Sequence, residues 1–293
     1  MIVIIKVAIL IIFIVAAFTA LSGKGVARLS PAAWPGPLSI FTGAAVLFVG
    51  YEGFGLITNA AANMANPRRE LPRAIYGSVA FVIVIYVLVA CGVVTNVPLN
   101  VLKGLGDSAL AVAAKPSLGQ AGFRLIAIAA LLSTASAVNA TLFGSANIAY
   151  QIAKNGDLPP AFDRKLWGRN VEGLFITSGL VLVFVLIFPL SAVASMGSAG
   201  FLLIYAAVSI GHLRIRKQTG ANTWLIAASA ITCLTLFGIL SYFMITTALT
   251  SAIALAVTLA VSLAAEILYR RATGRTFRDV LTQTDPGLTG VLS

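Results

Sequence analysis

An apolar segment that begins at Leu38 is interrupted by three glycines and one glutamate before it ends in a cationic loop. The interruption, FVGYEGFG, covers residues 48–55 and contains Glu52. A carboxylate near the centre of a bilayer is costly unless it faces the protein interior, a cavity or a partner. Glycines weaken a helix and leave backbone groups available to a ligand. The stretch 48–72 therefore predicts a discontinuous membrane helix of the kind found in transporters.

The composition of the whole chain agrees with a membrane protein. Of its 293 residues, 59% are hydrophobic and 10% are charged, whereas soluble domains carry about 25% charged residues. The net charge of +11 could suggest a nucleic-acid partner. The Lys and Arg residues, however, cluster between apolar runs, as in the cytoplasmic loops of membrane proteins. The sequence therefore predicts a polytopic membrane protein that does not bind nucleic acid.

Residues able to support metal or nucleophilic chemistry are scarce. Cys91 and Cys233 lie within apolar runs and lack metal-ligand spacing, and the single histidine, His212, lies at a predicted helix end. Neither a zinc site nor a Ser/His/Asp triad is expected from such a set. We predict packing roles for these three residues, and no enzyme activity, catalytic residue, metal or cofactor.

Apolar runs of spanning length recur along the chain, and we predict eight membrane helices. They cover residues 2–21, 38–65, 74–96, 121–152, 173–189, 198–213, 223–243 and 246–269. A tight turn is expected between the last two. The alternative for the first run is a cleaved signal peptide, but its positive charge, Lys6, lies inside the run and favours a true helix.

The regions outside these helices are more polar. A short helix is predicted over 107–114, with Asp107 or Ser108 as its cap. Eight helices place both termini on one side, which carries fourteen of the twenty Lys and Arg residues. The opposite side carries Lys24, Arg28, Lys103, Lys115 and Arg124. The positive-inside rule therefore predicts that both termini and the 66–73 loop are cytoplasmic.

Two ionisable residues lie within predicted spans. Glu52 could bind a substrate amine or a cation, or carry a proton, since desolvation favours its neutral form. Alternatively it caps the broken helix; the adjacent glycines favour a functional role. Lys6 lies about 8 Å along its helix. On position alone, it is expected to extend towards the headgroups rather than replace a bound cation.

Hydroxyl and aromatic side chains supply further candidates. Ser133 and Thr134 could ligate a small cation or hydrogen-bond a neighbouring helix, and both readings stay open. Phe48, Tyr51 and Phe54 flank the glycines and could stack over a ligand, although aromatic residues are common in any membrane span.

Several stretches resemble amino acid–polyamine–cation superfamily permeases, most closely the prokaryotic proton-coupled amino-acid permeases. GYEGFGLITNAA followed by NPRRELPRAI is similar to their sixth helix and the following loop. LLSTASAVNATLFGSANIAYQIAKNGDLP and GSAGFLLIYAAVSIGHLRIRK resemble the eighth and tenth helices, and VIIKVAILIIFIV the fifth. The resemblance covers nearly the whole chain, and the block at 50–75 is its specific part.

The resemblance implies an all-α membrane fold in which the eight spans are helices five to twelve of a LeuT-like five-plus-five inverted repeat. Helix five would cover 1–22, the second repeat 38–217, helices eleven and twelve 223–269, and a cytoplasmic tail 270–293. Helices one to four are absent from the chain. It is therefore expected to be a fragment, or to need a missing N-terminal portion or a partner chain, and to transport poorly alone.

The resemblance also implies a substrate site and a coupling site. The substrate's ammonium group would be held by backbone near the glycines, with aromatic side chains closing over it. The implied site residues are Phe48, Gly50, Tyr51, Glu52, Gly53, Phe54 and Gly55. Lys6 would take the place of a sodium ion and carry the coupled proton. The resemblance therefore favours this role over contact with the lipid headgroups. Ser133 and Thr134 fall where sodium-coupled relatives place second-sodium hydroxyls.

Two departures from the family pattern affect this site. Many relatives carry an acid where this chain has Gly55, and Glu52 lies three residues earlier. Relatives also often carry acids at the positions of Ala62 and Asn63. Cytoplasmic gating through those acids is therefore not implied for this chain.

The function expected from the residues and the resemblance is secondary active transport of amino acids across the cell membrane. Proton-coupled symport by alternating access is the expected mechanism, and the partners are an amino acid, a proton and the lipid bilayer. The alternative is a non-transporting subunit or scaffold that needs a partner supplying helices one to four.

Overall fold

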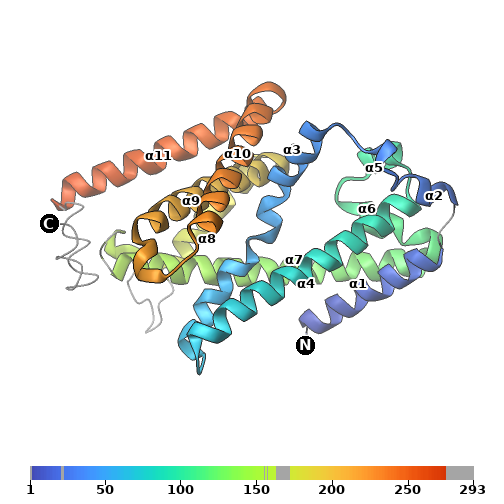
Figure 1. Ribbon diagram of the computed structural model, residues 1–293, viewed down its shortest axis with the longest axis horizontal. Coiled ribbons are helices and arrows are strands. Elements are labelled where there is room, and N and C mark those ends of the chain that lie inside the picture. The colour runs from blue at the N-terminus through green and yellow to red at the C-terminus, as the bar shows by residue number, and fades with distance from the viewer. Residues whose placement is uncertain (1, 21–22, 155, 157, 163–171, 275–293) are drawn as a thin grey trace. The chain divides into compact units, whose positions relative to one another are not determined.

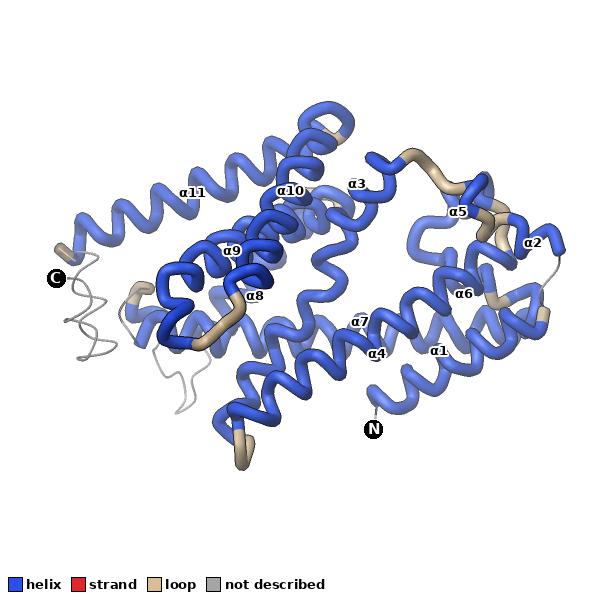
Figure 2. Tube along the Cα trace, viewed as in Figure 1, coloured by secondary structure: helices blue, strands red, loops and turns tan. Residues whose placement is uncertain are grey.

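The computed structural model describes residues 2–20, 23–154, 156, 158–162 and 172–274. All regular secondary structure in this part of the chain is helical (Figures 1 and 2). The residues form two compact units. The first comprises Met1–Ile40 and Gly50–Ser145, and the second comprises Phe41–Val49 and Ala146–Ser293.

The order of the helices follows the order of the apolar runs. The α-helices are α1 (Ile2–Thr19), α2 (Gly23–Ala27), α3 (Pro37–Leu47), α4 (Pro67–Asn96), α5 (Leu99–Leu105), α6 (Ala109–Ala113), α7 (Lys115–Lys154), α8 (Glu172–Ile187), α9 (Leu190–Thr219), α10 (Thr223–Thr247) and α11 (Leu249–Thr273). The 3₁₀ helices are η1 (Pro31–Ala33), η2 (Phe48–Asn63), η3 (Gly106–Ser108) and η4 (Pro160–Phe162).

Six helices among the described residues are long and apolar enough to cross a membrane. They are the helix over Pro37–Thr58 and helices α4, α7, α9, α10 and α11. Two further predicted spans, α1 and α8, are apolar but shorter. The chain is thus a multi-pass membrane protein whose described part is helical, as its composition predicts. The tight turn expected between the last two spans is confirmed, since only Ala248 separates α10 from α11.

In the first unit, α1 packs directly against α4 (Figure 1). The contact is close because α4 has a glycine there. A Cβ atom on Gly92 would lie 3.0 Å from Ala17 Cβ and 3.2 Å from Phe13 Cε1. The Asn96 side chain adds a polar tie by donating a hydrogen bond from Nδ2 to Ala17 O at 3.3 Å. The helix that carries Lys6 is therefore held firmly on α4.

In the second unit, α9 packs against both α10 and α11. Leu202, Leu240 and Met244 are fully or almost fully buried between these helices, and Ala45 of α3 joins the same cluster. Small residues such as Ala and Ser line much of the buried face of α9, which allows membrane helices to approach closely.

Two sequence predictions about local structure are wrong. The 66–73 segment is not a loop: α4 begins at Pro67, where the fixed φ of proline suits a first helical turn, and Glu70 Oε1 accepts a hydrogen bond from Asn66 N at 3.2 Å. Helix α9 begins at Leu190 rather than near residue 198, directly after Pro189.

The predicted cap of the short helix α6, Asp107 or Ser108, is contradicted for Ser108 alone. Ser108 makes no cap bond, because its hydroxyl donates to Leu105 O at 2.7 Å instead. The side chain of Asp107, the other predicted cap, lies outside the described part of the structure. The tail is predicted to begin at residue 270, but α11 continues to Thr273.

Candidate functional site

The predicted interruption coincides with a change of helix type. Helix α3 ends at Leu47, and the chain continues as the 3₁₀ helix η2 through Asn63. Runs of 3₁₀ helix longer than about four residues are uncommon and often mark a hinge or a strained sequence. Gly50, Gly53 and Gly55 all lie in η2, and a Cβ atom on any of them would meet no other atom within 4 Å. The glycines therefore border open space.

A buried serine fixes the start of this change. Ser198 of α9 is fully buried. Its hydroxyl accepts a hydrogen bond from Val49 N at 3.0 Å and donates one to Val46 O at 2.7 Å. One side chain thus satisfies two backbone groups where the α-helical ladder stops. Such groups would otherwise be unpaired in an apolar medium. Gly197 aids the approach, because a Cβ there would lie 3.3 Å from Val49 Cγ2.

Replacement of Ser198 with alanine is expected to destabilise the second unit by about 1–3 kcal/mol, since two buried backbone groups lose their partner. Thermal unfolding of the purified chain in detergent measures the change. Ser209→Ala on the same helix is the matched control, because the Ser209 hydroxyl makes an exposed contact with Ser229. Equal midpoints for the two variants would contradict the proposed role of Ser198.

A cavity of about 280 Å³ lies between η2 and α4. Gly50, Tyr51, Gly53 and Phe54 contribute to its wall from η2. From α4, Tyr86 packs against Tyr51 with ring centroids 5.3 Å apart and a 57° angle between the ring planes. Four of the seven predicted substrate residues therefore line one cavity with aromatic walls.

The other three predicted substrate residues do not line this cavity. Phe48 belongs to the second unit, where its ring packs edge-on against Tyr205 of α9 at 6.1 Å between centroids. Glu52 is half-buried, and its Oε1 atom is shielded from solvent. Gly55 is also half-buried.

The α4 side of the cavity was not anticipated from the sequence. Ser78, Val82 and Tyr86 line it and recur every four residues, which places them on one face of a helix. That spacing, ending in an aromatic residue, is the signal that could have identified them.

The three predicted coupling residues lie together at a second cavity of about 270 Å³ in the first unit. Lys6 approaches from α1, and Ser133 and Thr134 approach from α7. Lys6 and Ser133 are half-buried, and the Thr134 hydroxyl donates a hydrogen bond to Ala130 O at 2.9 Å. The remaining wall is apolar and includes Leu10 and Ile126. The Lys6 side chain thus lines a protein cavity that also contains two hydroxyl groups.

The second departure from the family pattern, at Ala62 and Asn63, is described for the backbone alone. The backbone of Ala62 and Asn63 lies in η2, but their side chains lie outside the described part of the structure.

A comparison with known protein families gives the identity of this helical membrane protein. Residues 1–269 match the model of the family described as amino acid permease. The chain belongs to the amino acid permease family. This membership supports the predicted relationship to the amino acid–polyamine–cation superfamily.

Similar proteins come from archaea and bacteria. An uncharacterised protein of Methanocaldococcus jannaschii is 42% identical over 80% of this chain and 54% of its own length. The Escherichia coli inner membrane transport protein YbaT is 33% identical over 74% of this chain and 50% of its own length. The Lactococcus lactis branched-chain amino acid permease BcaP is 26% identical over 75% of this chain and 48% of its own length. The chain spans about half the length of these curated relatives.

Proposed function

We propose that this permease chain takes part in secondary active transport of amino acids, coupled to the inward movement of a proton by alternating access. The observation that carries the proposal is the aromatic cavity beside the glycine-rich η2, in a chain of the amino acid permease family. A non-transporting scaffold is not favoured, because the matched family is described as amino acid permease and two of the reported relatives are named as transport proteins.

The η2 segment is proposed to bind the substrate's ammonium group. A glycine-rich, non-α-helical stretch leaves carbonyl groups that can accept hydrogen bonds from a ligand, as in discontinuous transporter helices. Tyr51 and Phe54 line the adjacent cavity, and their aromatic faces attract a cation such as an ammonium group. The proposed substrate residues remain those of the sequence prediction: Phe48, Gly50, Tyr51, Glu52, Gly53, Phe54 and Gly55.

Lys6 is proposed to carry the coupled proton. Its ammonium form places one positive charge in the cavity with Ser133 and Thr134, where hydroxyl oxygens could otherwise serve a small cation. Loss of the proton removes that charge.

The topology is likewise a proposal. Fourteen of the twenty Lys and Arg residues lie on the side of the predicted termini, which supports cytoplasmic termini by the positive-inside rule. We propose that α1 and α8 also cross the membrane. The five-plus-five repeat, with 38–217 as its second half, completes the proposed architecture.

The test is uptake into proteoliposomes by the protein that contains this chain. With an imposed inward gradient of one pH unit, one-to-one symport is expected to accumulate substrate up to about tenfold. A protonophore is expected to abolish accumulation of the amino acid, because it collapses the pH gradient. It is not expected to abolish exchange of internal for external amino acid. Accumulation that is insensitive to the pH gradient would contradict proton coupling.

Glu52→Gln is expected to weaken substrate binding or to alter its pH dependence, because the substitution removes a carboxylate with a shielded oxygen in the substrate-binding segment. Equilibrium binding of radiolabelled amino acids across a pH series measures both effects. Glu70→Gln is the control, since the Glu70 carboxylate is exposed and accepts a backbone hydrogen bond at the start of α4. Binding by Glu52→Gln that matches the control at every pH would return Glu52 to a structural role.

A further inference from the structure

A large cavity lies within the second unit, between α8 and α11. Its volume is about 680 Å³, and its walls are mainly apolar side chains such as Val183 and Phe184 of α8 and Val261 of α11. Along α11 the lining residues extend from Val257 to Tyr269, a distance of about 18 Å at 1.5 Å per residue. One leaflet of the hydrocarbon core is about 15 Å thick. The length of the cavity therefore matches a single leaflet.

The apolar walls are open on the outside of the unit. Val183 is 50% exposed and Val261 is 63% exposed, and both belong to helices with membrane-type composition. Side chains of this kind contact lipid tails when they lie within a bilayer.

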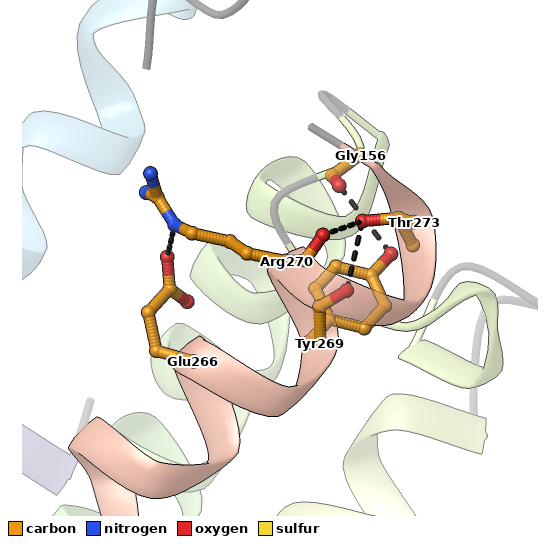
Figure 3. A network of polar contacts seen from close by, with 5 residues as sticks. All are labelled: Gly156, Glu266, Tyr269, Arg270 and Thr273. Atoms are coloured by element: carbon orange, nitrogen blue, oxygen red, sulfur yellow. Dashed lines mark hydrogen bonds and ion pairs between the residues drawn. The ribbon is translucent and has the colours of Figure 1, made fainter. Parts of the chain in front are cut away.

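One end of the cavity is polar, and a hydrogen-bond network fixes its geometry (Figure 3). The Tyr269 hydroxyl donates to Leu158 O at 3.0 Å and also lies 3.4 Å from Gly156 O. These bonds hold the segment that follows α7 against the last turn of α11. The Glu266 carboxylate pairs with Arg270 Nε on the same turn.

The described charges at this end are mostly positive. Arg270 and Arg271 occupy the last turn of α11, and Lys154 occupies the last turn of α7. Glu266 is compensated by its ion pair with Arg270. Arg271 and Lys154 are exposed. A basic end on a leaflet-length apolar cavity is complementary to an anionic lipid, whose phosphate would lie at the basic residues.

We propose that the α8–α11 cavity binds an acyl chain of an anionic phospholipid, in the leaflet where α11 ends, with the phosphate held by Arg271 and Lys154. The apolar walls accept the acyl chain, and the Tyr269 bonds hold the segment that follows Lys154 against the last turn of α11. This inference does not depend on the transport activity.

The test uses the purified chain in mixed micelles that contain phosphatidylglycerol or phosphatidylcholine with identical acyl chains. Native mass spectrometry counts retained lipids, and thermal unfolding reports stabilisation. Phosphatidylglycerol is expected to be retained preferentially. Arg271→Gln with Lys154→Gln is expected to weaken its binding by about 25-fold, at about fivefold for each charge. Arg216→Gln with Lys217→Gln removes equal charge from the end of α9 and is the control.

A second pair of variants tests the acyl-chain site. Val261→Trp is expected to obstruct the cavity and to lower lipid retention strongly, whereas Leu263→Trp, equally exposed on α11 but outside the cavity wall, is expected to leave retention unchanged. Equal retention of the two lipids, or full retention by Val261→Trp, would overturn the proposal. So would light scattering that shows a dimer for the wild type and a monomer for Val261→Trp, because a second copy would then fill the cavity. If Val261→Trp does not fold, the double variant at Arg271 and Lys154 and its control decide.

Discussion

Replacement of Lys6 with alanine is expected to abolish accumulation of amino acid driven by a pH gradient. If Lys6 carries the coupled proton, the alanine variant loses the link between the gradient and the substrate. With a gradient of one pH unit, the ratio of internal to external amino acid is then expected to fall from about tenfold to equal concentrations. Uptake at a series of external pH values, with the protein reconstituted in liposomes, measures the effect.

The control for Lys6→Ala is Lys217→Ala, which removes an exposed charge from the last turn of α9. It is expected to leave the pH dependence unchanged. Because Lys6 lies on a helix held against α4 by the contact at Gly92, its replacement at the cavity wall should leave the fold intact. Unchanged pH-dependent uptake by Lys6→Ala would assign Lys6 to headgroup contact and reject it as the proton carrier.

Substitution of Gly53 with leucine is expected to weaken substrate binding by tenfold or more. Gly53 lines the cavity between η2 and α4, and a Cβ atom there meets no other atom within 4 Å. The protein can therefore accept the side chain, which would occupy space in a cavity of about 280 Å³. One methylene group changes affinity by about 10–200-fold in an apolar pocket. Competition with a radiolabelled amino acid gives the affinity.

Gly211→Leu is the matched control for this substitution. Gly211 is an exposed helical glycine on α9 with similar open space around its Cβ position, and it lines none of the cavities described above. Wild-type affinity in Gly53→Leu, with the control unchanged, would show that the η2–α4 cavity does not hold the substrate.

The sequence predicted the order of the helices well, because long apolar runs are a direct consequence of a bilayer environment. The predicted interruption, at three glycines in six residues that disfavour a regular α-helix, lies within the 3₁₀ helix η2, which begins at Phe48, before the first of these glycines. The sequence did not anticipate that α4 begins at Pro67, because Arg68 and Arg69 are charged helical residues outside the apolar part of that helix. Hydropathy has no signal for such an extension.

The candidate site was predicted in part. Tyr51 and Phe54 line the η2 cavity, and Lys6 lies beside Ser133 and Thr134; their functional roles stay predictions. The contribution of Ser198 could not be predicted, because a serine in an apolar helix most often only assists packing. Its role depends on backbone groups about 150 residues earlier, and no local pattern reports such a contact.

The most direct test of the central claim is a simultaneous measurement of amino-acid uptake and internal pH. Proteoliposomes containing the protein and a trapped pH-sensitive dye would receive substrate without any imposed ion gradient. Proton-coupled symport predicts acidification of the lumen that begins with substrate entry, saturates with substrate concentration and disappears in Lys6→Ala. Substrate entry with no change in internal pH would contradict the account.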